Sequence, residues 1–130
     1  MPTTYRYDHI HLRSANPRQT ADFYHTMFGA KIVETPQPSG PTRVDLDING
    51  LTVFIAGPGP DGVTPAGPTE PHTGLDHFGF LVDNLDEAVA ELKAKGAQFA
   101  TEPRVIPSGI KIAFVRGPDG VRIELVQRRR

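Results

Sequence analysis

An internal duplication constrains the fold of this chain more than any other feature of its sequence. The dipeptide Asp-His occurs at residues 8–9 and again at 76–77, and in both copies an asparagine follows the histidine at the same distance, at Asn16 and Asn84. Self-similarity at a fixed period indicates one structural unit used twice. A unit of half this length buries too little apolar surface to be stable alone. We therefore expect the two units to pack on each other, within one chain or across a dimer.

Each copy carries the signals of one helix. Asn16 and Asn84 both have a Gln or Glu three residues later, which is the spacing of an N-cap residue and its capping-box partner. Pro17 suits the first helical position and Gly29 suits the residue just past the end. These signals predict one helix from Pro17 to the residue before Gly29, and a second over residues 85–95.

Strand patterns surround each helix, and they give both copies the element order β-α-β-β-β. Alternation of apolar and polar residues is the basis of these assignments. Strands are predicted at residues 5–14, 31–35, 42–48 and 51–56 in the first copy, and at 78–82, 98–101, 110–116 and 121–127 in the second. We expect an α+β fold in which the two βαβββ repeats form an incomplete barrel with the helices outside.

A segment rich in proline and glycine, residues 57–74, separates the two copies. Such a composition cannot form a helix or a central strand. We interpret it as a linker, and as a segment that could cover a site. The predicted organisation is one domain, residues 1–130, made of repeat 5–56 and repeat 73–127.

Composition excludes several classes of function. The formal net charge is -1 and the basic residues are scattered, so no broad positive face for nucleic acid is evident. The chain has no cysteine, which excludes disulfides and thiolate metal sites. No apolar run approaches the roughly 20 residues of a membrane span, and the first residues lack a signal-peptide pattern. We expect a cytoplasmic protein that binds neither nucleic acid nor a membrane.

Two histidines and one glutamate are the strongest candidates for chemistry. His9 and His77 are equivalent positions of the duplication, on the first strand of each copy, and should point into the same cavity. Glu124 lies in mid-strand between apolar neighbours, where an unpaired carboxylate costs several kcal/mol of desolvation. A bound metal would remove that cost. Two imidazoles and one carboxylate form a facial triad that leaves positions open for substrate, water or dioxygen.

The alternative is that these three residues have structural roles only. In that case His9 and His77 are bonded to backbone groups, and Glu124 pairs with Arg122 or Arg116. Most isolated histidines and glutamates are not ligands, so the residue types alone leave both interpretations open.

Further candidates share the inward face of the strands. His11 lies two residues after His9 and could act as a general acid or base, or simply line the cavity with a backbone bond. Tyr7 is a second catalytic candidate on the same face. Arg13 and Arg122 could bind an anionic group of the substrate, or pair with acidic neighbours at the rim.

Several segments together resemble a known superfamily. They are YDHIHLRS at 7–14, ADFY at 21–24, FGAK at 28–31, LDHFGFLV at 75–82 and GPDGVRIELV at 117–126. These segments are similar to the vicinal oxygen chelate superfamily, which includes glyoxalase I, methylmalonyl-CoA epimerase, fosfomycin-resistance enzymes, extradiol dioxygenases and bleomycin-resistance proteins. The resemblance covers nearly the whole chain apart from the linker.

The resemblance implies a metal site and a small-molecule substrate. It places metal ligands at His9, His77 and Glu124, where one divalent ion would bind two adjacent substrate oxygens and act as a Lewis acid. The nitrogen and oxygen donors favour Fe(II) or Mn(II), with Zn(II), Ni(II) or Co(II) possible. Glyoxalase I and the epimerase use a fourth ligand, and the matching position here is Phe54, which we predict contacts the substrate instead. Members of this size commonly form homodimers.

Three functions follow, in order of preference. The first is a three-ligand metalloenzyme with dioxygenase-type chemistry. The second is a glyoxalase-like lyase or isomerase in which water or a substrate oxygen replaces the fourth ligand. The third is a metal-free protein that sequesters a drug or metabolite, as bleomycin-resistance proteins do, although the complete His, His, Glu set counts against it.

Overall fold

The structure, a computed structural model, describes residues 2–59 and 64–128. The chain divides into two compact units, unit 1 at residues 1–64 and unit 2 at residues 65–130. Part of the predicted linker, residues 60–63, lies outside the described residues. The described remainder of the linker contains no helix or strand.

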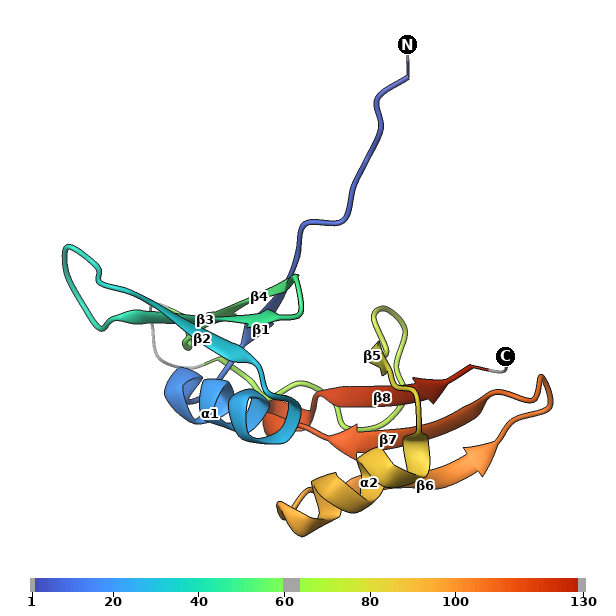
Figure 1. The fold of residues 1–130 in the computed structure, drawn as a ribbon. Coiled ribbons are helices and arrows are strands. Elements are labelled where there is room, and N and C mark those ends of the chain that lie inside the picture. The colour runs from blue at the N-terminus through green and yellow to red at the C-terminus, as the bar shows by residue number, and fades with distance from the viewer. Residues whose placement is uncertain (1, 60–63, 129–130) are drawn as a thin grey trace. The chain divides into compact units, whose positions relative to one another are not determined.

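Unit 1 is a four-stranded mixed sheet with one helix on one face (Figure 1). The strand order is β1-β4-β3-β2, with β1 parallel to β4 and the other pairs antiparallel. Parallel neighbours need a long crossover connection, and α1 is part of it. The elements are β1 (His9–Arg13), α1 (Pro17–Phe28), β2 (Lys31–Thr35), β3 (Arg43–Ile48) and β4 (Leu51–Ala56).

Unit 2 repeats this topology. Its strand order is β5-β8-β7-β6, with β5 parallel to β8 and the other pairs antiparallel, and α2 lies on one face of the sheet (Figure 1). The elements are β5 (Phe78–Leu81), α2 (Leu85–Ala94), β6 (Phe99–Val105), β7 (Lys111–Arg116), a short 3-10 turn η1 (Pro118–Gly120) and β8 (Arg122–Gln127). The α+β class and the duplicated βαβββ topology are as predicted.

Each sheet has one face covered by its helix and one face turned away from it. In unit 1 the buried apolar residues alternate along β3, at Val44, Leu46 and Ile48, and they lie with Val53 of β4 and Tyr24 of α1 in the core. Ile123 and Leu125 of β8 have the same role in unit 2. Since strand side chains alternate, the intervening residues occupy the opposite face, which we call the open face of each unit. The candidate site residues lie on these open faces.

The helix boundaries follow from the caps that the sequence predicts. The side chain of Asn16 accepts from the backbone N–H of Gln19 at 3.2 Å, and that of Asn84 accepts from Glu87 at 3.0 Å. Gly29 ends α1 with φ at 71°, a left-handed conformation that glycine adopts without strain. Thus both predicted N-caps are confirmed.

Two strand predictions need correction. β1 begins at His9 rather than at residue 5, because its partner β4 begins at Leu51 and the pairing starts at His9 and Thr52. β6 continues to Val105, beyond the predicted end at residue 101, through two shifts of register. Pro103 lies between the paired positions Thr101 and Arg104, and an edge strand tolerates a proline there because no inward N–H is required.

Neither α1 nor α2 has the length and apolarity that crossing a membrane requires, and the described residues contain no other helix that does.

Candidate metal and substrate site

The structure brings His77 and Glu124 together on the open face of unit 2. His77 directly precedes β5, and the parallel pairing of Gly79 with Glu124 places the carboxylate beside the imidazole. Nε2 of His77 lies 3.4 Å from Oε1 of Glu124. A Cβ atom added at Gly79 would lie 3.4 Å from the Cβ of Glu124 and 3.6 Å from its Oε1. A side chain at residue 79 would therefore lie in van der Waals contact with this carboxylate.

Asp76 fixes the orientation of the His77 ring. Nδ1 of His77 lies 2.7 Å from Oδ2 of Asp76, and Arg122 pairs with the same oxygen. The hydrogen bond from His77, with the positive charge of Arg122, holds the pKa of Asp76 below its ordinary value of 3.8 against the opposing effect of partial burial. Asp76 is therefore an ionised acceptor at neutral pH, so that Nδ1 carries the proton. In the neutral ring with this tautomer, the lone pair of Nε2 faces Glu124.

This arrangement suits a bound cation. With Nδ1 protonated, Nε2 of His77 and the carboxylate of Glu124 are two acceptors facing each other across 3.4 Å. Two ligand atoms that each lie about 2.1 Å from one ion are roughly 3.0 to 3.4 Å apart in octahedral or tetrahedral geometry. A carboxylate that orients a histidine ligand through its other nitrogen is a frequent partner at metal sites. The pair thus has the donor chemistry and the spacing of two ligands.

Unit 1 repeats the oriented histidine. Nδ1 of His9 lies 2.6 Å from Oδ2 of Asp8, as Nδ1 of His77 lies beside Asp76. Both histidines are therefore held through Nδ1 by the carboxylate of the preceding residue. This shared detail supports the interpretation of His9 and His77 as equivalent groups.

The carboxylate, however, has no equivalent in unit 1. His11 pairs with Phe54 in the register of β1 and β4, and Gly79 pairs with Glu124 in the register of β5 and β8. Phe54 is therefore the structural counterpart of Glu124. Its ring packs on His9, with the ring centroids 4.4 Å apart. Unit 1 thus offers a histidine and an aromatic ring where unit 2 offers a histidine and a carboxylate.

Within residues 2–59 and 64–128, no three His, Asp or Glu side chains are grouped closely enough to hold one ion. Unit 2 contributes two donors, His77 and Glu124. His9 belongs to unit 1, and the three-residue ligand set stays a prediction.

An arginine packs on an aromatic ring beside each histidine. In unit 2 the guanidinium carbon of Arg122 lies 4.4 Å from the centroid of Phe114, whose ring contacts His77. In unit 1 the guanidinium carbon of Arg43 lies 4.7 Å from the centroid of Phe54. Sequence reasoning missed Arg43. The alternation along β3, carried over from the neighbouring strands, could have placed it on the open face.

The other predicted residues have varied surroundings. Tyr7 precedes β1 and is 66% exposed. Arg13 donates from Nη1 to the carbonyl oxygen of Gly57 at 2.7 Å, which ties the end of β1 to the start of the linker. Arg122 pairs with Asp76, an acidic neighbour, as one of the two alternatives for this residue suggested.

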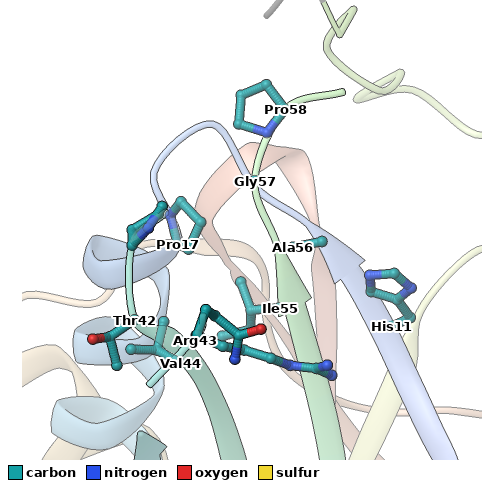
Figure 2. Close-up of a pocket in the computed structure, with 11 residues that line it drawn as sticks. His11, Pro17, Thr42, Arg43, Val44, Ile55, Ala56, Gly57 and Pro58 are labelled. Carbon is teal, nitrogen blue, oxygen red and sulfur yellow. The ribbon is translucent and has the colours of Figure 1, made fainter. Parts of the chain in front are cut away.

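His11 is exposed on β1 and lines a pocket of about 440 Å³ in unit 1 (Figure 2). Neither of its ring nitrogens is bonded to a backbone carbonyl in the described part of the chain. This pocket gives His11 a setting in which it can meet a small molecule.

Comparison with known proteins identifies related sequences over almost the whole chain. The family model described as Glyoxalase/Bleomycin resistance protein/Dioxygenase superfamily matches residues 6–125. The uncharacterized protein YwkD of Bacillus subtilis (strain 168) is 32% identical over 124 residues, which cover 92% of this chain and 94% of that protein. The lactoylglutathione lyase of Escherichia coli O157:H7 is 26% identical over 92% of this chain and 90% of its own length.

Some relatives are longer. The chain spans 16% of a probable chloroplastic lactoylglutathione lyase of Arabidopsis thaliana, with 41% identity over 42% of this chain. It spans 44% of the lactoylglutathione lyase GLX1 of the same plant, with 28% identity over 95% of this chain. Among solved structures, a glyoxalase family protein from Enterococcus faecalis has a TM-score of 0.74 and 28% identity, covering 94% of this chain and 97% of that one.

Proposed function

Because the chain belongs to the Glyoxalase/Bleomycin resistance protein/Dioxygenase superfamily, we propose that it is a divalent-metal-dependent enzyme that binds a small substrate through adjacent oxygen atoms. The observation that carries the proposal is the His77–Glu124 pair, with Nε2 and Oε1 3.4 Å apart and the imidazole oriented by Asp76.

We propose His9 as the third protein ligand, contributed by unit 1 of the same chain or of a partner chain. The support is the equivalence of the two Asp–His pairs, which prepares Nε2 of each histidine in the same way. The metal, when bound, supplies Lewis acidity that stabilises negative charge on the substrate oxygens. Fe(II) and Mn(II) suit this mixed nitrogen and oxygen donor set best.

The preferred reaction is dioxygenase-type chemistry. Phe54 occupies the position in unit 1 that corresponds to Glu124, as the matching registers indicate, and a phenyl ring cannot coordinate. Two histidines and one carboxylate leave positions for a bidentate substrate and dioxygen. The absence of a carboxylate at residue 54 therefore favours this reaction over one that needs four protein ligands.

A glyoxalase-like lyase or isomerase is the second candidate. The lactoylglutathione lyase of E. coli, which matches the chain over 90% of its own length, favours it. In this case His11, whose strand position lies beside Phe54, is the general base that we propose. We propose His11 and Tyr7 as catalytic groups, and Arg13 and Arg122 as residues that contact the substrate.

Oxygen dependence separates the two reactions. Protein loaded with Fe(II) or Mn(II) would be assayed for oxygen consumption with catechols, and for lactoylglutathione formation under anaerobic conditions. Dioxygenase chemistry predicts turnover only with oxygen present, whereas anaerobic formation of lactoylglutathione would establish the second candidate. A protein that binds no divalent metal yet binds a drug or metabolite tightly would contradict both and support a sequestering role.

The role of His11 has its own test. His11→Gln should lower kcat by about 100-fold or more, as loss of a general acid or base does, while the metal content stays at the wild-type value. Wild-type kcat in this variant would assign His11 to the cavity wall.

A further inference from the structure

The sheet of unit 1 opens between β3 and β4, and unit 2 has no such opening at the equivalent place. The pairing of β3 with β4 ends at Leu46 and Val53. In contrast, the pairing of β7 with β8 extends along both strands, from Arg116 and Arg122 to Lys111 and Gln127. The two repeats therefore differ at residues 43–45 of β3 and 54–56 of β4, which lack the backbone pairing seen in unit 2.

The side chain of Asp45 takes the place of the missing backbone pair. Its Oδ1 accepts from the N–H of Ile55 at 2.9 Å, and its Oδ2 accepts from Nε of Arg43 at 2.7 Å. The Asp45 side chain is only 12% exposed. A buried carboxylate with both oxygens bonded holds the strands in this open arrangement, because its removal would leave a buried N–H without a partner.

A pocket of about 440 Å³ lies at this opening (Figure 2). Its apolar wall includes Pro17, Val44 and Ile55, and its polar lining includes His11 and Arg43. The volume falls within the range of about 300 to 1,000 Å³ that is typical of small-molecule sites. An apolar wall with a few polar groups is also typical of such sites.

Arg43 is held in place as an anion-binding group. Its Nε is bonded to Asp45, and its guanidinium lies over the ring of Phe54. In Figure 2 the side chain of Arg43 extends across the strand that carries Ile55 and Ala56, toward the strand that carries His11. Within the described part of the chain, Asp45 accepts from Nε of Arg43. The two terminal amino groups of Arg43 can therefore donate to a ligand. A fixed guanidinium loses little entropy when it binds a planar carboxylate.

We propose that this pocket binds an organic acid. The carboxylate of the ligand accepts from the terminal amino groups of Arg43, with His11 as a second donor, and its hydrocarbon part packs against Pro17, Val44 and Ile55. Binding of the acid goes beyond the proposed metal chemistry and does not depend on it. Because Phe54 contacts both Arg43 and His9, the bound acid would lie close to a predicted metal ligand.

Benzoate is the probe for this site, and benzamide is its uncharged counterpart. Binding would be measured by NMR titration of full-length protein in EDTA, so that no metal contributes. We expect benzoate to bind, with the largest shifts at Val44, Ile55 and Ala56, and benzamide to bind at least tenfold more weakly, as loss of a charged hydrogen bond predicts. Equal binding of the two probes, or shifts centred on Arg122 in unit 2, would overturn the proposal.

Substitutions make the test specific. Arg43→Gln should weaken benzoate binding about 10- to 100-fold, and Arg43→Lys should have a smaller effect because the charge remains. Arg104→Gln removes the same charge from an exposed position of unit 2 and should bind benzoate like the wild type. Wild-type affinity in Arg43→Gln would contradict the proposal.

Two more variants separate this site from the proposed metal site. Ala56→Leu fills the pocket with Arg43 intact and should abolish benzoate binding, with an unchanged circular dichroism spectrum to show that the protein folds. Glu124→Ala should lose metal and retain benzoate binding. Retained binding in Ala56→Leu, or lost binding in Glu124→Ala, would place the anion outside this pocket.

Discussion

At the scale of single residues, the two Asp–His pairs orient the histidines that we propose as metal ligands. Asp8 and Asp76 each hold Nδ1 of the next residue, at 2.6 Å and 2.7 Å. Orientation of this kind fixes the tautomer and raises the basicity of the other nitrogen. The duplication thus repeats a chemical arrangement as well as a fold.

The role of Asp76 can be measured directly. Asp76→Asn removes the ionised acceptor that holds His77, so the metal affinity should fall about 10- to 100-fold, as it does when such partners are lost. Competition with a chromophoric chelator measures the affinity. Asp86→Asn is a matched control, since Asp86 pairs with Lys111 away from His77, and it should leave the affinity unchanged. Equal affinities for both variants would show that Asp76 does not orient a ligand.

At the scale of elements, Asp45 holds the opening between β3 and β4. Asp45→Ala leaves the buried N–H of Ile55 and the guanidinium of Arg43 without their acceptor. We expect a loss of about 1 to 3 kcal/mol in the free energy of unfolding, measured by urea denaturation. Asp45→Asn keeps one acceptor oxygen and should lose less. If Asp45→Ala were as stable as the wild type, the carboxylate would not support the opening.

The two N-caps make a second prediction at this scale. Asn16→Ala and Asn84→Ala each remove the acceptor for a backbone N–H at the start of a helix. Each substitution should cost about 1 kcal/mol of stability. Thr26, in the last turns of α1 and exposed, offers a control in Thr26→Ala, for which no such loss is expected. An unchanged urea midpoint for either Asn variant would show that its cap contributes nothing.

Local signals account for how well the elements could be predicted. The limits of α1 are determined by Asn16, Pro17 and Gly29. The limits of β4 are determined by the alternation along that strand. Both elements therefore have the bounds that the sequence predicts. The end of β6 depends on where β7 offers a partner around Pro103. That information is not local, so the predicted strand ended too early, at residue 101.

At the scale of the whole molecule, the duplication predicted the shared topology of the units and the approach of His77 to Glu124. It could not predict the pocket in unit 1, because the pocket arises where the repeats differ. Asp45 occupies the position that corresponds to Phe114, as the registers of the two sheets indicate, and only the structure shows that its carboxylate replaces a backbone pair. The duplication thus predicted the fold. The two candidate sites lie where the repeats carry different residues, Glu124 against Phe54 and Asp45 against Phe114.

The metal content of the protein is the decisive measurement for the proposed metal site at His9, His77 and Glu124. Protein purified without a chelator or an immobilised-metal column would be analysed for all divalent metals, as wild type and as Glu124→Ala, with circular dichroism to verify that both are folded. We expect about one divalent ion per chain in the wild type, and loss of that ion in the variant, because a carboxylate is one of its proposed ligands. A folded wild type that binds no divalent metal, or a Glu124→Ala variant that retains it, would rule out the proposed metal site.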